Sequence, residues 1–240
     1  MGEAIAKALI RTEVCARLHV TARSEARVAR LLGQSSKVSV CDAAALVESS
    51  SIVIVALRPD DARDLLPGLP FAPTHHVISV MAAIRCAELT KMTGPVASSC
   101  RMITLPSVAG GGQTIPVFPH SDAAQALFGE SNKLFDTGSE ERLLAFWAVT
   151  GLLSSTLTVG KAGADWLAGQ GIDRRAGDAY AAALFNEVHA LLGEGFQNGL
   201  DEVSTPGGLN ATVRQNLEDK GFTEVLNANL DSLYERLTKD

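Results

Sequence analysis

The chain has 240 residues, of which 46% are hydrophobic and only 5% aromatic, and it carries a formal net charge of −6. This length allows two modest domains, and the composition favours a soluble protein rich in helices over an all-β protein. The acidic charge, without a basic stripe, argues against partners such as nucleic acids or anionic membranes.

Apolar runs such as Ile52–Leu57 are much shorter than the ~20 residues that a membrane span needs. The start of the chain has no cationic segment followed by an apolar one, as a secretory signal would require. The four cysteines lack metal-ligand spacing, and no histidine stands at a zinc-like interval from them. We therefore expect a cytoplasmic protein with reduced cysteines, no metal site and no membrane partner.

The first part of the chain alternates between strand and helix patterns. Apolar segments predict strands over residues 18–22, 38–40, 51–57, 75–80, 96–103, 113–118 and 134–135. Helical patterns and capping residues predict helices over residues 2–11, 25–32, 43–48, 60–66 and 121–128. The Ile-Val-Ile-Val run within 51–57 indicates a strand buried on both faces, as in a parallel sheet covered by helices. The alternation predicts a doubly wound α/β sheet of the Rossmann type.

The character of the chain changes after residue 138. Helical periodicity continues almost to the end and predicts helices over about residues 139–158, 161–169, 173–198, 209–220 and 222–238. We therefore expect a nucleotide-binding domain over residues 1–138 and an all-α domain over residues 139–240.

The beginning of the chain lacks part of the pattern that a Rossmann unit normally shows. In such a unit a strand leads into G-x-G-x-x-G, and the cofactor pyrophosphate rests on the next helix. Here the helix follows Met1 directly, so Gly2 is a candidate for the last glycine, and the first strand and earlier glycines are missing. Either Met1 is an internal residue of a longer chain, or the protein begins with a helix.

Three segments of the first domain are candidates for cofactor binding because they follow strands. Ala22-Arg23-Ser24 stands where an acidic residue would bind the ribose of NAD and an arginine can hold the 2′-phosphate of NADP. Arg23 favours NADP over NAD, although exposed arginines are common at strand ends. The other two segments are Leu57-Arg58-Pro59 and Ser79-Val80-Met81-Ala82, which would face the cofactor crevice at the carboxyl ends of the strands. The small residues of the second would leave room for a nicotinamide. Ordinary strand termination explains both segments equally well.

The segment Val203–Asn210 precedes an amphipathic helix expected to begin near Ala211. Gly207 and Gly208 allow a ligand to come close, and a helix N-terminus offers free N–H groups with partial positive charge. The segment is therefore a candidate seat for a carboxylate, or else a tight turn between packed helices. No Cys–His or Ser–His–Asp signature is present, which suits hydride transfer, where the cofactor carries the chemistry.

Several segments resemble pyrroline-5-carboxylate reductases, and the likeness runs over nearly the whole chain. The most specific match is Thr205-Pro206-Gly207-Gly208 with Lys220-Gly221-Phe222. Weaker matches are Met1–Ala6, Ile52–Pro59, Val77–Ile84 and Arg101–Ile103. The resemblance implies a Rossmann domain, a helical domain that forms a homodimer or a higher homo-oligomer, and reduction of a cyclic imine carbon by NAD(P)H.

The resemblance also implies a substrate site. It places Asn210 and Thr205 near the reacting substrate. The substrate carboxylate would bind the amides of Gly207 and Gly208, and Ser107 and Ser155 would be further contacts. This chain departs from the family in having Asn210 in place of a threonine, and in the segments Ile103–Ser107 and Thr150–Ser155. The substrate is therefore expected to be an imine or a related small carboxylated compound, not necessarily pyrroline-5-carboxylate.

Two other functions fit the sequence. The missing strand and altered substrate segments suit a catalytically inactive dimer that serves as a scaffold or nucleotide sensor. A β-hydroxyacid dehydrogenase shares the same plan of domains and usually needs a lysine in its helical domain. Lys161 is the only lysine between Ser139 and Asp219 and is the candidate for that role.

Overall fold

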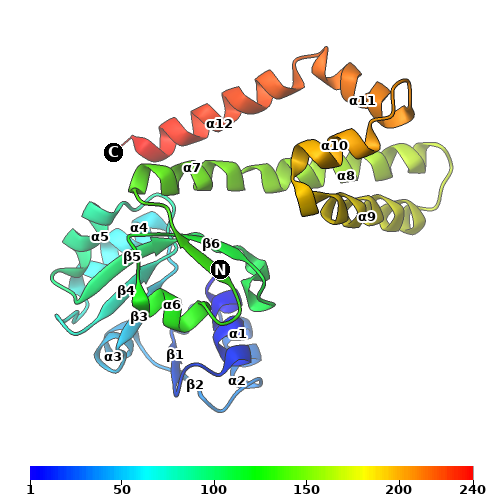
Figure 1. Ribbon diagram of the computed structural model, residues 1–240. Coiled ribbons are helices and arrows are strands. Elements are labelled where there is room, and N and C mark those ends of the chain that lie inside the picture. Colours follow the sequence, from blue (N-terminus) through cyan, green and yellow to red (C-terminus); the bar gives the residue numbers. More distant parts are fainter. Residues whose placement is uncertain (240) are drawn as a thin grey trace. The chain divides into compact units, whose positions relative to one another are not determined.

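The computed structural model describes residues 1–239 (Figure 1). These residues form two compact units, Met1–Trp147 and Ala148–Lys239, which divide within helix α7 (Glu140–Thr150). The first unit is α/β and the second is helical. The sequence-based boundary stands at residue 138, where the last strand has just ended.

The first unit contains all seven expected strands. Its elements are α1 (Gly2–Thr12), β1 (Leu18–Val20), α2 (Glu25–Leu32), β2 (Val38–Val40), α3 (Ala43–Glu48), β3 (Ile52–Val55), α4 (Pro59–Leu65), η1 (Leu66–Gly68), β4 (His76–Ser79), α5 (Cys86–Thr93), β5 (Ser98–Met102), η2 (Pro106–Ala109), β6 (Thr114–Phe118), α6 (Asp122–Phe128) and β7 (Lys133–Asp136). Asp42 caps α3 as predicted, because its carboxylate accepts the N–H of Ala45 at 2.9 Å. Helix α5 was not predicted.

The strands form a five-stranded sheet in the order β3-β4-β5-β6-β7 and a separate parallel pair, β1 and β2. The larger sheet is parallel except between β5 and β6, which run antiparallel. The sheet is thus dominated by parallel pairs, as in the doubly wound sheet that was predicted, with one antiparallel pair. The connection over residues 103–113 holds only the short turn η2, and a parallel arrangement needs a longer crossover.

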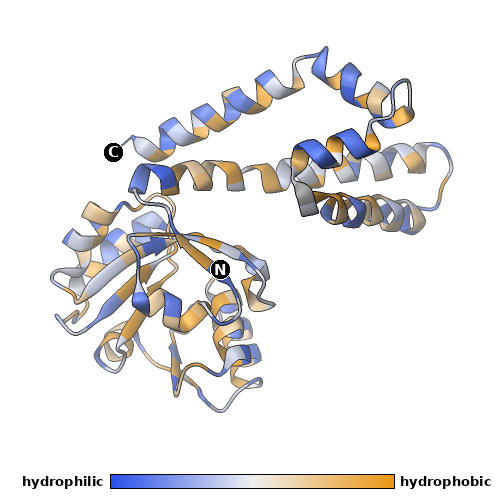
Figure 2. Ribbon diagram, in the orientation of Figure 1, coloured by the Kyte–Doolittle hydropathy of each residue, from blue (hydrophilic) through white to orange (hydrophobic). Residues whose placement is uncertain are grey.

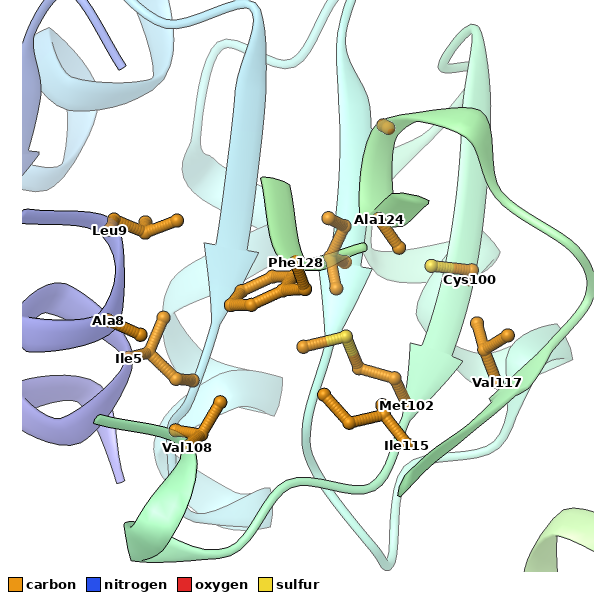
Figure 3. Close-up of a cluster of buried hydrophobic side chains, with 12 residues drawn as sticks. Ile5, Ala8, Leu9, Cys100, Met102, Val108, Ile115, Val117, Ala124 and Phe128 are labelled. Atoms are coloured by element: carbon orange, nitrogen blue, oxygen red, sulfur yellow. The ribbon is translucent and has the colours of Figure 1, made fainter. Parts of the chain in front are cut away.

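The residues of β3 alternate between two hydrophobic clusters, one on each face of the sheet. Ile52 and Ile54 pack against a cluster that contains residues of α1 and α6 (Figure 3). Val53 and Val55 belong to a second cluster with residues of α3, α4 and α5. This confirms the expectation from the apolar run that the strand is buried on both faces.

Arg101 in β5 is fully buried and holds several segments of the first unit together. Its Nη1 donates to Glu140 Oε1 at 2.5 Å, and its guanidinium carbon lies 4.6 Å from the ring centroid of Trp147. Its Nη2 donates to the carbonyl oxygens of Met81 at 3.2 Å and Ala82 at 2.6 Å. One side chain therefore links the loop after β4 to the first turn of α7.

The carboxylate of Glu140 extends this network to α5. Its Oε1 also accepts the backbone N–H of Cys86 at 2.7 Å, and Arg85 lies 3.3 Å from its Oε2. Burial raises the pKa of Glu140, but the hydrogen bonds from Cys86 and the Arg101 charge outweigh burial and hold the pKa below its usual value. The pair is therefore ionised at neutral pH.

The second unit contains α8 (Leu152–Gly169), α9 (Arg174–Leu191), η3 (Leu192–Glu194), α10 (Phe196–Val203), α11 (Leu209–Glu218) and α12 (Phe222–Thr238). Two predicted helix boundaries were wrong. The break expected near residue 160 lies at Gly151, and the helix expected over 173–198 ends at Leu191. Gly195 has φ of +98°, a conformation that suits glycine and separates η3 from α10.

Gly160 of α8 allows this helix to pack closely against α9, whereas Gly177 of α9 leaves room for a Cβ in ordinary van der Waals contact. A Cβ on Gly160 would lie 2.5 Å from the ring of Phe185, and a Cβ on Gly177 would lie 3.5 Å from the carbonyl oxygen of Ala164. Gly163, also in α8, has open space at the Cβ position. The glycines of α8 are therefore not equivalent.

The helices of the second unit contain many apolar residues (Figure 2). Large apolar side chains on them are exposed. They include Leu153, Leu157, Val159 and Trp166 on α8, Tyr180, Leu184 and Val188 on α9, and Leu209, Val213 and Leu217 on α11. In the described chain, one helical stretch, Glu140–Gly169, has the length and composition of a membrane span, with a mean hydropathy of 1.6. The sequence analysis had considered only shorter apolar runs.

Replacing Gly160 with Ala should destabilise the second unit by about 1–3 kcal/mol, because the added methyl group overlaps the Phe185 ring. Gly163→Ala is the matched control and should stabilise α8 by about 0.5–1 kcal/mol. Urea unfolding followed by circular dichroism measures both. Equal effects of the two substitutions would contradict the packing described for Gly160.

Replacing Glu140 with Ala should lower the free energy of unfolding by about 3–5 kcal/mol, because it leaves the buried charge of Arg101 without its partner. The control is Glu141→Ala. Glu141 is 58% exposed and pairs with Arg85 at 2.9 Å, so its loss should change stability by less than about 1 kcal/mol. Similar losses in both variants would show that the Arg101 pair is not a major constraint.

The ion pair of Glu140 with Arg101 should also make the free energy of unfolding depend on pH in the acidic range. The pKa of folded Glu140 is depressed, so its contribution to stability is fully present above the unfolded-state pKa of ~4.3 and is lost as the pH falls through the folded-state pKa. Wild-type protein should therefore lose more stability than Glu140→Gln when the pH falls below about 4. Parallel unfolding curves for the two proteins across this range would refute the assignment.

Candidate functional site

The carboxyl ends of β3, β4 and β5 lie side by side at one edge of the larger sheet. The register pairs Val55 with Ser79, and Ser79 with Arg101. The start of α1 adjoins the segment after β5, because the hydroxyl of Thr104 donates to Met1 Sδ at 3.2 Å. Strand ends and a helix N-terminus are therefore close together, as in the crevice where α/β sheets bind nucleotides.

The N-terminus of α1 is a candidate position for a phosphate. A Cβ placed on Gly2 would meet no heavy atom within 4 Å, so the space beside this helix end is open. The first peptide N–H groups of a helix carry partial positive charge and are suited to an anion. Gly2 and the first turn of α1 can thus hold the pyrophosphate of a dinucleotide.

The loop after β4 is held rigidly. Ser79 is fully buried, and its Oγ accepts the N–H of Met81 at 3.2 Å. Met81 is buried in the second cluster, and the carbonyl oxygen of Ala82 accepts the Arg101 guanidinium. Ser79 and Met81 therefore shape the loop from within.

The segment after β3 leads directly into α4. Leu57 packs against the second cluster, Arg58 is exposed and is the N-cap of α4, and Pro59 is the first helical residue. Proline is favoured there because the first N–H groups of a helix have no internal partner. This abrupt start places the first turn of α4 beside the strand end.

The segment after β1 carries the predicted phosphate-binding arginine. Ala22 and Arg23 are exposed, and Ser24 is the N-cap of α2 without a side-chain capping bond. Arg23 Nη2 donates to Asp61 Oδ2 in the first turn of α4 at 2.6 Å. The guanidinium therefore already has an acidic partner, which the sequence analysis did not foresee.

Ser107 lies in η2, in the connection between β5 and β6. Gln113 Nε2 donates hydrogen bonds to Ser107 Oγ at 2.5 Å and to the carbonyl oxygen of Leu105 at 3.0 Å. Arg11 braces this connection from α1 by donating to the carbonyl oxygen of Ala109 at 3.0 Å. Ser107 thus has an internal partner within the first unit.

Thr205, Gly207, Gly208 and Asn210 come together in one turn of the second unit. The N–H of Gly208 donates to the carbonyl oxygen of Thr205 at 2.9 Å, and Gly207 has φ of +74°. Helix α11 begins at Leu209, as helical periodicity predicted and two residues before the start expected near Ala211. Asn210 Nδ2 donates to the carbonyl oxygen of Val203 at 3.2 Å. The tight-turn geometry is present, and it directs the start of α11 toward solvent.

The remaining candidates of the second unit lie on α8. Ser155 and Lys161 are exposed, and Lys161 pairs with Asp165 at 2.5 Å. Among the described residues, no group of three or more metal-ligating side chains is found. Arg101 and Glu140 were missed as site residues. The signal that could have found the buried pair was a lone arginine within the predicted strand 96–103, between Cys100 and Met102.

Residues 1–83 match the family described as NADP oxidoreductase coenzyme F420-dependent. No curated protein matches the chain. Among solved structures, the chain is similar to a 1-pyrroline-5-carboxylate reductase from Streptococcus pyogenes, with 19% identity and a TM-score of 0.80 over 99% of this chain and 94% of that one.

Two further structures are similar to this one. The Plasmodium falciparum pyrroline carboxylate reductase with NADP bound has 14% identity and a TM-score of 0.80, over 99% of this chain and 93% of that one. The Myxococcus stipitatus imine reductase in complex with NADP+ has 15% identity and a TM-score of 0.57, over 99% of this chain and 89% of that one. The chain thus has the Rossmann-plus-helical fold of the pyrroline-5-carboxylate reductases, as its sequence resemblance predicted.

Proposed function

We propose that the chain is an NADP-linked reductase that delivers a hydride to the imine carbon of a small carboxylated substrate. The observation that carries this proposal is the juxtaposition of strand ends, the open N-terminus of α1 and Arg23 within a segment that matches an NADP oxidoreductase family. The similar Plasmodium falciparum and Myxococcus stipitatus structures, which contain NADP and NADP+, support the choice of cofactor.

The residues of the crevice have separate roles in this proposal. Gly2 and the first turn of α1 would hold the pyrophosphate, and Arg23 with Ser24 would hold the 2′-phosphate. Leu57-Arg58-Pro59 would flank the adenosine, and the loop Ser79–Ala82 would support the nicotinamide. NADPH would supply the hydride, whereas the protein orients the reactants.

The turn Thr205–Asn210 is the proposed substrate site of the second unit. The amides at the start of α11 would receive the substrate carboxylate. The side-chain amide of Asn210 can donate from Nδ2 to a neutral imine nitrogen, or accept at Oδ1 from the N–H of a protonated imine, but it has no acidic proton to transfer. Reduction of C=N to CH–NH takes one hydride at carbon and one proton at nitrogen, so the proton would arrive with a protonated imine or from water.

Homodimerisation through the second unit is part of the proposal. Two helices carry exposed apolar residues at intervals of four: Tyr180, Leu184 and Val188 on α9, and Leu209, Val213 and Leu217 on α11. Residues at this spacing lie on one face of a helix, so each set forms an exposed apolar stripe. Large exposed apolar patches on soluble proteins often mark interaction sites. A second copy of the chain, in the cytoplasm, is the partner that we propose.

The first test is calorimetric titration with NADPH and NADH, followed by loss of NADPH absorbance with a panel of cyclic imine carboxylates. Binding with turnover of an imine is expected. Tight binding without turnover would favour a scaffold or sensor. Oxidation of a β-hydroxyacid that is abolished by Lys161→Met would instead favour a β-hydroxyacid dehydrogenase.

Replacing Asn210 with Ala should lower kcat roughly 10- to 100-fold and leave the Kd for NADPH unchanged, because the side chain is proposed to contact only the substrate. Asn216→Ala, on the exposed surface of the same helix, is the matched control and should retain full activity. Full turnover by the Asn210 variant would show that the site is misplaced.

Replacing Leu184 with Glu should convert a dimer to monomers, because a charge would enter the apolar stripe of α9. Asn186→Glu adds the same charge about 200° around the helix and should leave the dimer intact. Analytical ultracentrifugation gives the masses. Monomeric wild-type protein, or wild-type protein that instead sediments with lipid vesicles, would contradict the proposed partner.

A further inference from the structure

The ion pair between Arg23 and Asp61 crosses the proposed cofactor crevice. Arg23 follows β1, and Asp61 stands in the first turn of α4, the helix that follows β3. Their atoms Nη2 and Oδ2 are 2.6 Å apart, and both side chains are solvent-accessible, at 58% and 41% exposure. Both partners can therefore be reached by a ligand that enters between these two segments.

A cofactor 2′-phosphate would meet the carboxylate of Asp61 at this arginine. The phosphate and Asp61 are both anions, and both use the same guanidinium N–H groups. A carboxylate also accepts hydrogen bonds from ribose hydroxyl groups, which is how NAD is held in such folds. Asp61 thus disfavours binding of the 2′-phosphate of NADP and favours binding of the unphosphorylated ribose of NAD.

The neighbouring cations of α2 are also paired. Arg30 donates two hydrogen bonds to Glu3, at 3.0 and 3.1 Å, and Arg27 lies 3.8 Å from the same carboxylate. Arg30 and Lys7 lower the pKa of Glu3 to about 2, so this carboxylate is ionised throughout the neutral range. Three cations therefore share one carboxylate at Glu3, whereas Arg23 is paired one to one with Asp61 before a cofactor arrives.

We propose that Asp61 determines cofactor specificity by competing with the 2′-phosphate for Arg23, and that it narrows the preference for NADP over NAD. This inference rests on the proposed function. It predicts that the chain uses both cofactors with a small ratio of affinities, and that the carboxylate of Asp61 sets that ratio.

The test replaces Asp61 with Asn in the full chain and measures Kd by calorimetry. The probes are 2′,5′-ADP and 5′-AMP, which differ only in the 2′-phosphate, followed by NADPH and NADH. Asp61→Asn should lower the Kd of 2′,5′-ADP and of NADPH about 3- to 10-fold. It should leave the Kd of 5′-AMP and of NADH unchanged or raise it. The gain should shrink as salt is raised, because the site is exposed.

Asp60→Asn is the matched control. It removes the same charge from the same turn of α4, but Asp60 pairs with Arg63 at 3.1 Å and is 94% exposed. It should leave the ratio of affinities unchanged. In an Arg23→Ala background, the gain from Asp61→Asn should be smaller, because the contested guanidinium is gone.

Three results would overturn the inference. Asp61→Asn could shift NADPH and NADH equally, Asp60→Asn could give the same gain, or the gain could persist in full without Arg23. If imine reduction is observed alongside any of these, only the role of Asp61 fails. If neither 2′,5′-ADP nor 5′-AMP binds the folded chain, the proposed cofactor function fails as well.

Discussion

The buried ion pair of Arg101 and Glu140 is the constraint on which the shape of the first unit depends. A guanidinium with no solvent exposure must be matched by fixed acceptors, and here these come from the loop after β4 and the first turn of α7. Such a pair adds little net stability over an apolar alternative, but losing either partner is costly. The loop that would support a nicotinamide is therefore held by charge and hydrogen bonds.

The two units handle apolar surface in different ways. In the first unit, both faces of β3 are covered by hydrophobic clusters, so its apolar run is satisfied within the chain. In the second unit, stripes on α9 and α11 remain exposed. In our proposal, the exposed stripes of the second unit are covered by a second copy of the chain.

Local patterns accounted for most of the fold, because strands and caps are specified by neighbouring residues. Asp42 and the Ile-Val-Ile-Val run identified α3 and β3 correctly. Helix α5 was missed, since its start is fixed partly by the distant carboxylate of Glu140 accepting the N–H of Cys86. The helix break near residue 160 was wrong because Gly160 serves packing against Phe185 rather than helix termination.

The sequence alone determined the order of elements, the α/β-then-helical plan and the resemblance to pyrroline-5-carboxylate reductases, because these depend on periodicity, turn residues and short motifs. The tertiary structure decided which charges meet. Arg101 with Glu140 and Arg23 with Asp61 are separated by 39 and 38 residues, and no local pattern brings them together. Only the tertiary fold, which brings the segment after β1 against α4 and β5 against α7, places these groups within hydrogen-bonding distance. In our proposal, cofactor choice is set at the Arg23–Asp61 pair.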